Sequence, residues 1–575
     1  MRSARAVAIG FAISLAACHR TALPPKPDGA AVVTTETPVP GDVPLAPEVE
    51  PNDTLATAQK VALDATLAGG VAGSLHEGQG KARDTDLFRL DVPAPAGAPT
   101  PPPAPRDATA DAAGAPSVLR RALRVDVKPA DGVAVSFEAL DDQGQALAAT
   151  GAGQPGEALA LPNVAVTPGV YYLRLRAAPA VPGAGGAGGS ATASYRLTVH
   201  IGPLEAGAEV EPNGKAAIAT DLAVPGEAVG FYGWRHDQDW FRVPTAGLAE
   251  GSVLGADLDP APGVTASLLV FDSVEQKLTE VRGRKEERVA LRSVRVPTGE
   301  PYVYVVVRAD AGWNADARYA LRLTSGLPEA GAEIEPNDDT AHAQAVADVA
   351  EGGAITVAGH LGRGDVDVFR YAATIPVELD VEVAPPERVD VKLEVLRPDG
   401  TVLAKSDTGK RRESEHLPNV FVPGGAAFIR LSAAKGDGNA DEPYRLSIAV
   451  HPPEPGAERE PNDALATATE LPPGAVGGGL IAPRGDVDFW RAAAPPDAQG
   501  NVNVSVGGVP GVPLDVHVRA TGGEELGRFA VAAGAPAGAN VIATGGQPCC
   551  VVEVRAANAK AAANPRDRYS LAVGK

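Results

Sequence analysis

The sequence predicts an all-β fold made of four tandem β-sandwich domains of jelly-roll type. Turn residues are abundant between short β-branched runs, since the 575 residues include 65 Gly and 53 Pro. Apolar and polar residues alternate with period 2 in segments such as 123–127, 391–395 and 514–518. That alternation is typical of strands with one buried face. The third observation is that one sequence pattern occurs four times along the chain.

The repeated pattern consists of two acidic phrases. The first reads Glu-x-Glu-Pro-Asn, and successive copies of its second Glu are separated by 161, 124 and 125 residues. The second phrase reads Asp-x-Asp, then an apolar residue, an aromatic residue and Arg. A period this long indicates domains rather than the turns of a solenoid.

The repeats set the predicted domain boundaries. An insert at about 93–116 and a Gly/Ala-rich loop at 183–190 explain the longer first step, because such low-complexity segments cannot bury a core. We predict a signal peptide at 1–17, a Pro/Ala-rich tether at 18–45, and sandwiches at 46–203, 204–327, 328–452 and 453–575.

Within each unit the elements follow a common order. The Asn that ends the first phrase and the Asp that follows it favour a short helical turn, as at 52–58. A strand with a Gly-containing turn comes next, as at 71–75 and 357–361, and precedes Asp-x-Asp. Later strands include 172–176 and 428–431, and each unit closes on a strand that contains Tyr. Seven or eight short strands in about 120 residues are typical of a β-sandwich, and we favour the jelly-roll type.

The N-terminus has the features of an export signal. Arg2 and Arg5 precede an apolar run at 6–17, which is too short to span a bilayer as a permanent helix. The ending Leu-Ala-Ala-Cys resembles the lipobox of bacterial lipoproteins, which implies lipidation of Cys18. The alternative is an ordinary cleaved signal peptide with an incidental Cys18. His19 after the Cys favours the outer membrane, so we expect a lipid-anchored protein of the bacterial cell envelope. Both the periplasmic and the surface-exposed side of that membrane stay open.

The net charge excludes some classes of partner, and the two remaining cysteines raise a question of bonding. A net charge of −21 argues against nucleic acid or an anionic membrane surface as a partner. Cys549 and Cys550 are adjacent in a predicted strand. A vicinal disulfide is strained, and two unbonded cysteines on opposite faces of the strand are the more common arrangement.

The acidic phrases carry a family resemblance. The order Glu-x-Glu-Pro-Asn-Asp, a Gly-turn strand, Gly-Asp-x-Asp-x-Phe and a strand such as 391–400 resembles the bacterial pre-peptidase C-terminal domain. That family includes the collagen-binding domains of bacterial collagenases. The resemblance covers nearly the whole chain from about residue 46, once per unit. It implies a compact β-sandwich that binds calcium, and it implies that the two phrases meet in space.

Oxygen-only side chains in this pattern suit a hard cation such as Ca²⁺, whereas zinc or copper would favour His or Cys. Glu residues at i and i+2 of an extended segment project to one face. An alternative is that the first phrase is a linker with a Pro turn and an Asn cap, and that Asp-x-Asp is a solvated strand end. The resemblance implies these calcium ligands: Glu48, Glu50, Asn52, Asp53, Asp84, Asp86, Glu209, Glu211, Asn213, Asp237, Asp239, Glu333, Glu335, Asn337, Asp338, Asp365, Asp367, Glu458, Glu460, Asn462, Asp463, Asp486 and Asp488. Gly214 replaces the Asp of the first phrase, so we expect a weaker second site.

No catalytic constellation is found in the sequence, and we expect a protein without enzymatic activity. We expect the tandem sandwiches to bind an extracellular polysaccharide or protein through avidity. The alternative is a calcium-stiffened structural spacer of the cell envelope, which the short junctions between units favour. An accessory or enzyme of peptidase type is the remaining class. Ten Tyr in the whole chain argue against collagen as the ligand.

Overall fold

The computed structural model describes residues 43–76, 84–94, 120–177, 192–204, 207–347, 352–494, 500–542, 549–558 and 563–574. Among these residues there is no α-helix, and the prediction of an all-β fold is confirmed. The helical segments are three 3-10 turns, η3 (Ala216–Ile218), η4 (Ala434–Gly436) and η5 (Leu465–Thr467). The predicted signal peptide, Cys18, most of the tether and most of the two low-complexity segments lie outside the described residues.

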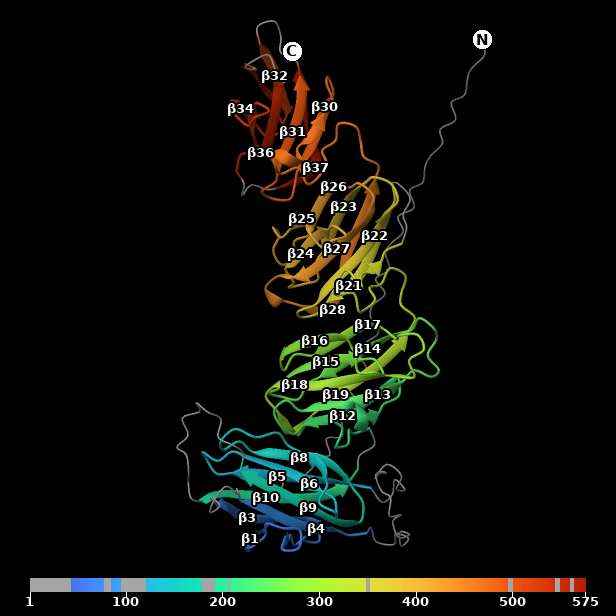
Figure 1. The fold of residues 1–575 in the computed structure, drawn as a ribbon, viewed down its shortest axis with the longest axis vertical. Coiled ribbons are helices and arrows are strands. Elements are labelled where there is room, and N and C mark those ends of the chain that lie inside the picture. Colours follow the sequence, from blue (N-terminus) through green and yellow to red (C-terminus); the bar gives the residue numbers. More distant parts are fainter. Residues whose placement is uncertain are drawn as a thin grey trace, which may run out of the picture. The chain divides into compact units, whose positions relative to one another are not determined.

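The strands form eight sheets, and each pair of sheets draws its strands from one repeat (Figure 1). In the first sandwich, one sheet contains β1 (Leu45–Pro47), β3 (Ala68–His76), β10 (Thr192–Pro203), β5 (Arg121–Pro129) and β8 (Leu159–Val166) in spatial order. The facing sheet contains β2 (Gln59–Lys60), β4 (Thr85–Val92), β9 (Gly169–Ala177), β6 (Val135–Leu140) and β7 (Ala146–Ala149).

The second sandwich follows the same plan. One sheet contains β12 (Gly226–Tyr232), β19 (Asn314–Gly326), β14 (Val253–Asp259) and β17 (Val289–Arg295). The other contains β11 (Thr220–Asp221), β13 (Gln238–Pro244), β18 (Tyr302–Ala311), β15 (Thr265–Phe271) and β16 (Lys277–Lys285).

The third sandwich has a sheet of β21 (Ala354–Leu361), β28 (Asn439–His451), β23 (Val377–Ala384) and β26 (Glu415–Val422). Its second sheet contains β20 (Gln344–Ala345), β22 (Val366–Ala373), β27 (Gly425–Ala433), β24 (Val391–Leu396) and β25 (Val402–Ser406). In the fourth sandwich one sheet contains β30 (Val476–Ile481), β37 (Asn564–Gly574), β32 (Asn501–Gly507) and β35 (Ala537–Ile542). The other contains β29 (Thr469–Leu471), β31 (Val487–Ala494), β36 (Cys549–Ala556), β33 (Leu514–Arg519) and β34 (Glu525–Val531).

The strand order is that of a jelly roll. If the eight long strands of a sandwich are counted from its Gly-containing strand, one sheet has the order 1-8-3-6 and the other the order 2-7-4-5. This holds in all four repeats, for example as β12-β19-β14-β17 facing β13-β18-β15-β16. Two sheets of four antiparallel strands with these crossovers define the jelly roll. The predicted fold type is therefore confirmed, and residues 43–575 form one compact unit.

Each sandwich has its own apolar core between its two sheets, built mainly from Val and Leu. The aromatic residue after Asp-x-Asp is fully buried in every copy, as Phe88, Phe241, Phe369 and Trp490. In the fourth core Cys549 and Cys550 form a disulfide with each other, so the expectation of two unbonded cysteines is wrong. Among the described residues no helix is long and apolar enough to cross a membrane.

Candidate metal centre

The two acidic phrases of each repeat meet in space. The residue after the second Asp of Asp-x-Asp donates its backbone N–H to the carbonyl oxygen of the Asn in the first phrase. The four bonds are Leu87 to Asn52 at 3.1 Å, Trp240 to Asn213 at 3.0 Å, Val368 to Asn337 at 2.9 Å and Phe489 to Asn462 at 3.1 Å. The main chain itself therefore holds the phrases together, and the contact does not depend on a side-chain rotamer.

Each meeting point gathers carboxylates. Both Glu residues of the first phrase and the second Asp of the second phrase offer oxygens that lie within 4.8 Å of one another, and the third sandwich adds Asp365. We call these four groups the inner clusters. They are Glu48, Glu50 and Asp86; Glu209, Glu211 and Asp239; Glu333, Glu335, Asp365 and Asp367; and Glu458, Glu460 and Asp488.

Backbone N–H groups orient the two Glu side chains of each inner cluster. In the fourth sandwich the N–H of Leu480 donates to Glu458 Oε1 at 2.7 Å, and the N–H of Asn462 donates to Glu460 Oε2 at 3.0 Å. Equivalent bonds are found in the other three sandwiches. A carboxylate oxygen has more than one lone pair, so these bonds leave it free to accept a further ligand.

The first Asp of Asp-x-Asp occupies a different position. Asp237 Oδ2 accepts the N–H of Gly233 at 2.7 Å, and Asp486 Oδ2 accepts the N–H of Ala482 at 2.7 Å. Asp365 Oδ2 accepts the N–H of Gly362 at 2.9 Å. These three Asp residues close the turn before their strand, and only Asp365 also belongs to an inner cluster. Asp84, whose Oδ1 accepts the N–H of Thr85, lies outside the first inner cluster.

The Asp that follows the Asn is also outside the inner clusters. Asp53, Asp338 and Asp463 are exposed, whereas the neighbouring Asn residues are fully buried. Gly214 occupies this outer position in the second sandwich, where the inner cluster still has both Glu residues and Asp239. Gly214 is the reason for expecting a weaker second site, but it leaves all the inner carboxylates of that site in place.

The Tyr of the closing strand, to which the sequence pattern assigns no site role, lies against each inner cluster. The Tyr195 hydroxyl lies 3.0 Å from Glu48 Oε1 and 2.5 Å from Asp86 Oδ2, and it hydrogen-bonds to both. Tyr319, Tyr444 and Tyr569 are fully buried at the equivalent position. The signal was present in the sequence, because this Tyr recurs in register in all four units.

In every repeat the closing-strand Tyr packs against a Gly of the first long strand of the sandwich, β3, β12, β21 or β30. A Cβ atom at the equivalent positions Gly73, Gly230, Gly359 or Gly479 would overlap the Tyr hydroxyl. At all of these except Gly230 it would also overlap a carboxylate oxygen of the first Glu. Glycine is therefore required here by the close approach of side chains rather than by a positive φ.

Burial raises the pKa of several of these carboxyl groups, and at Asp86, Asp239, Glu335 and Asp367 neighbouring carboxylates add to the effect. The pKa of Glu335 is raised to about 8 and that of Glu458 to about 7. The pKa of Asp86 is raised to about 8 for the same reason. Burial and the neighbouring carboxylates hold the pKa values of Asp239 and Asp367 well above the usual range of an Asp.

The inner clusters lack the partners that buried charges normally have. No ion pair reaches an inner carboxylate within the described part of the chain. No hydrogen bond of standard geometry from a described residue reaches either carboxylate oxygen of Asp239, Asp367 or Asp488, although all three side chains are fully buried. The hydroxyl of the closing-strand Tyr interacts with each of them and only partly offsets the rise in its pKa. Two unit charges about 4 Å apart repel by about 4 kcal/mol at an effective dielectric near 20. A hard divalent cation would fit this donor set, because it accepts several carboxylate and amide oxygens at once.

Three of the four inner clusters lie where one sandwich meets the next. The N–H of Glu335 donates to the carbonyl of Ser293 at 3.0 Å, and its own carbonyl accepts the N–H of Arg295 at 2.8 Å. Glu211 and Glu460 make the same pair of bonds with the preceding sandwich.

The junction also changes how far the site is buried. The exposed fraction is 3% for Glu211, 5% for Glu335 and 8% for Glu460, whereas Glu50 is exposed and makes no such backbone bonds with another sandwich among the described residues. The side chain of Asn419, in the third sandwich, also donates to Glu458 Oε1 at 2.9 Å. The second, third and fourth clusters are thus shared between two sandwiches, and within the described ranges the first has contacts in one sandwich alone.

Comparison with known proteins gives structural likenesses of low similarity. No protein-family model and no curated protein matches the chain. The tandem CBM51 modules of Sp3GH98, a family 98 glycoside hydrolase from Streptococcus pneumoniae, are 12% identical, with a TM-score of 0.13 over 39% of this chain and 84% of theirs. The CUB1-EGF-CUB2 domain of human MASP-1/3 is 8% identical, with a TM-score of 0.14 over 39% of this chain and 98% of that chain. A Sulfolobus Turreted Icosahedral Virus structure is 10% identical, with a TM-score of 0.14 over 58% of this chain and 78% of that chain. At these scores the likenesses say nothing about function, and the fold assignment stands on the strand order.

Proposed function

We propose that this chain is a non-catalytic, calcium-binding lipoprotein of the bacterial cell envelope, in which calcium stiffens a tandem array of pre-peptidase C-terminal-like jelly rolls. The observation that carries the proposal is the set of buried carboxylate oxygens at Asp239, Asp367 and Asp488 that, within the described residues, accept no hydrogen bond of standard geometry and no ion pair. Burying several unpaired carboxylates is costly, and a calcium ion would supply both the charge and the coordination that they lack.

The proposed ligands of each ion are the inner carboxylates, with the adjoining Asn as a further oxygen donor. Oδ1 of Asn52, Asn213, Asn337 and Asn462 is buried without a hydrogen-bond partner. Asp53, Asp338 and Asp463, with the first Asp of each Asp-x-Asp, would act at the edge of the site. Calcium accepts six to eight oxygens in flexible geometry, so inner and outer groups can contribute together.

The position of three clusters at junctions favours a role in stiffening the array. The second Glu of the first phrase binds the preceding sandwich through its backbone and would bind calcium through its side chain. An ion at that place would restrain the Glu and with it the junction. Capture of an extracellular polysaccharide or protein is the second function that we propose, and an arginine-lined cavity at the junction of the second and third sandwiches supports it.

Hydrogen exchange tests the stiffening role directly. With calcium, we expect slow exchange of the amides that join the sandwiches, such as those of Glu335 and Arg295, and faster exchange of these amides in EDTA. The amide of Ile448, in the middle of β28, is the internal control because it lies within one sheet. Equal exchange at the junctions with and without bound calcium would contradict the proposal.

The anchoring part of the proposal rests on the sequence alone and has its own test. A Cys18→Ala chain should leave the membrane fraction and appear in the soluble envelope fraction, while the parent chain should stay with the outer membrane. Retention of both chains in the membrane fraction would contradict lipidation at Cys18.

A further inference from the structure

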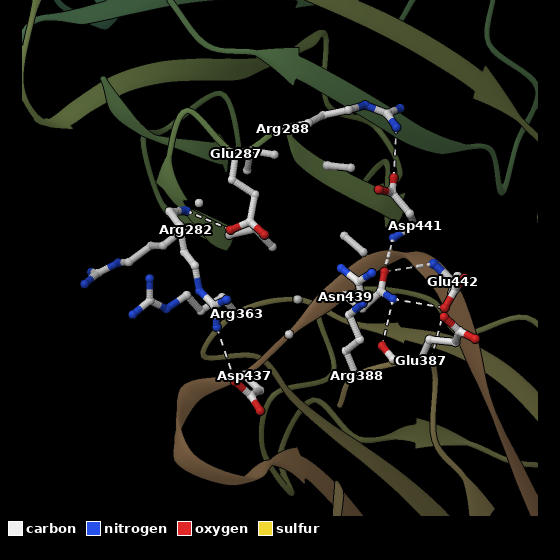
Figure 2. Close-up of a pocket in the computed structure, with 18 of the residues that line it drawn as sticks. Arg282, Glu287, Arg288, Arg363, Glu387, Arg388, Asp437, Asn439, Asp441 and Glu442 are labelled. Carbon is white, nitrogen blue, oxygen red and sulfur yellow. Dashed lines mark hydrogen bonds and ion pairs between the residues drawn. The ribbon is translucent and has the colours of Figure 1, made fainter. Parts of the chain in front are cut away.

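A cavity of about 430 Å³ lies between the second and third sandwiches (Figure 2). One wall comes from β16, β17 and the turn between them, and the other from loops of the third sandwich and the start of β28. The lining has no aromatic residue, and its apolar members are limited to Val and Ala. A volume in the range of roughly 300 to 1,000 Å³ is typical of small-molecule sites, and a polar lining favours a polar ligand.

The cavity is rich in arginine, although the whole chain has a net charge of −21. Six arginines and five acidic residues line it. The arginines are Arg282, Arg284, Arg288, Arg363, Arg388 and Arg411. The balance of charge in the cavity therefore depends on which of these groups already have partners.

Two of the acidic residues are paired with arginines of the cavity. Asp437 is buried and contacts Arg411 at 2.6 Å and Arg284 at 3.2 Å, and these guanidinium groups lower its pKa. Asp441 pairs with Arg288 at 2.8 Å across the junction. These ion pairs also connect the two walls of the cavity.

The other three carboxylates accept a hydrogen bond or form an ion pair, and among the described residues only Glu387 of the three has a charged partner. Glu287 Oε2 accepts the N–H of Arg284 at 3.0 Å. Glu387 pairs with Arg412, which lies outside the lining, at 3.3 Å. Glu442 Oε2 accepts the N–H of Glu387 at 3.0 Å. Every carboxylate of the lining thus has at least one donor.

Two guanidinium groups are left over. Among the described residues, no hydrogen bond or ion pair involves the side chain of Arg363 or Arg388, and both residues are exposed. The partner of Arg282 is Glu280, which is not part of the lining. The lining has one more arginine than carboxylates, so its formal charge is slightly positive, and Arg363 and Arg388 are the guanidinium groups that can meet a ligand.

We propose that this cavity binds an oxyanion, carboxylate or sulfate, carried by an extracellular polysaccharide. A guanidinium presents parallel N–H donors that match the two oxygens of such a group. The lack of aromatic and large apolar residues in the lining argues against capture of an apolar peptide side chain. The proposal deepens the ligand-binding part of the proposed function and names the class of ligand.

The cavity also borders the third inner cluster. A smaller cavity beside it reaches Glu333, Glu335 and Asp365. The two cavities share the lining residues Val281, Ala290, Gly362 and Ala440. A calcium ion at that cluster would hold the two walls in place and add positive potential. Calcium dependence of the binding rests on the proposed function, whereas oxyanion binding by Arg363 and Arg388 does not.

The test measures binding of polysaccharides to the full chain by isothermal titration calorimetry in 150 mM NaCl, with calcium and with EDTA. The probes are polygalacturonate for carboxylate, dextran sulfate for sulfate and dextran as the neutral control. The test variant is Arg363→Gln with Arg388→Gln. The matched control is Arg370→Gln with Arg445→Gln, which removes two exposed charges from the same sandwich away from the cavity.

We expect at least tenfold weaker binding of one polyanion by the test variant and less than a twofold change in the control variant. The polyanion that binds identifies the group as carboxylate or sulfate. Failure of both polyanions to bind, equal binding of dextran, or equal losses in the two variants would overturn the proposal. If no calcium is found in the protein but the test variant alone loses binding, the oxyanion site stands and the calcium assignment fails.

Discussion

The backbone N–H of Glu335 donates to the carbonyl oxygen of Ser293 at 3.0 Å, which joins the third sandwich to the second. The side chain of the same Glu335 belongs to the third inner cluster. One residue therefore takes part in both the interdomain contact and the candidate calcium site. Because Glu211 and Glu460 repeat this arrangement, ion binding and junction rigidity should be coupled at three places in the chain.

Calcium should raise the thermal stability of the chain. Binding to the folded state alone contributes about 2.7 kcal/mol at a ligand concentration of one hundred times Kd. We expect the melting transitions to shift upward in calcium relative to EDTA, as followed by scanning calorimetry, and elemental analysis to find at least four calcium ions per chain. The sequence predicts larger shifts for the third and fourth sandwiches than for the second. An unchanged melt with no bound metal would exclude the site.

Substitution of a central ligand should have opposite effects with and without calcium. Asp367 is fully buried in the third inner cluster, and its carboxylate is repelled by those of Asp365 and Glu335 in the absence of metal. Asp367→Asn should therefore stabilise the protein in EDTA and reduce the bound calcium by at least one ion per chain. Asp338→Asn, at the exposed outer position, is the matched control and should retain the ion. Equal calcium loss in both variants would show that the outer Asp is as important as the inner one.

A methyl group at Gly359 should distort the third site. The added Cβ would overlap the Tyr444 hydroxyl and the Glu333 carboxylate, and overpacking of this kind costs about 1 to 3 kcal/mol. We expect Gly359→Ala to lower both the melting temperature and the calcium content. Gly326→Ala is the control, because a Cβ there meets nothing within 4 Å. A Gly359→Ala protein with normal calcium content would show that the close packing of Gly and Tyr is unimportant for the site.

The metal-free protein should lose stability as the pH rises. The pKa values of Asp365, Glu211 and Glu335 are raised by burial to about 6, 7 and 8. Because these groups hold protons more tightly in the folded state than in the unfolded state, their contribution is complete below about pH 4 and is lost through pH 6 to 8. Urea unfolding in EDTA should therefore give a lower free energy of unfolding at pH 8 than at pH 5. Calcium binds the deprotonated groups, so the stabilisation by calcium should increase over the same range.

The repeat and its alternation predicted the jelly rolls, and the family resemblance of the repeated phrases implied the carboxylates of the candidate site. Val and Leu at period 2 can bury only one face of a strand, which leads to two facing sheets. The recurrence of Glu-x-Glu-Pro-Asn with Asp-x-Asp also identified all the inner carboxylates.

Only the tertiary structure decided which side chains from distant strands and from neighbouring sandwiches come into contact. Whether Asp86 or Asp53 faces Glu48 depends on how distant strands pair, and the sequence spacing does not determine that. The Tyr195 hydroxyl comes from a strand more than one hundred residues away, so its role emerges only when β10 pairs with β3. The same reason applies between sandwiches. Burial of Glu335 and the arginine cavity both require two separate repeats to be in contact, and no single repeat encodes that contact.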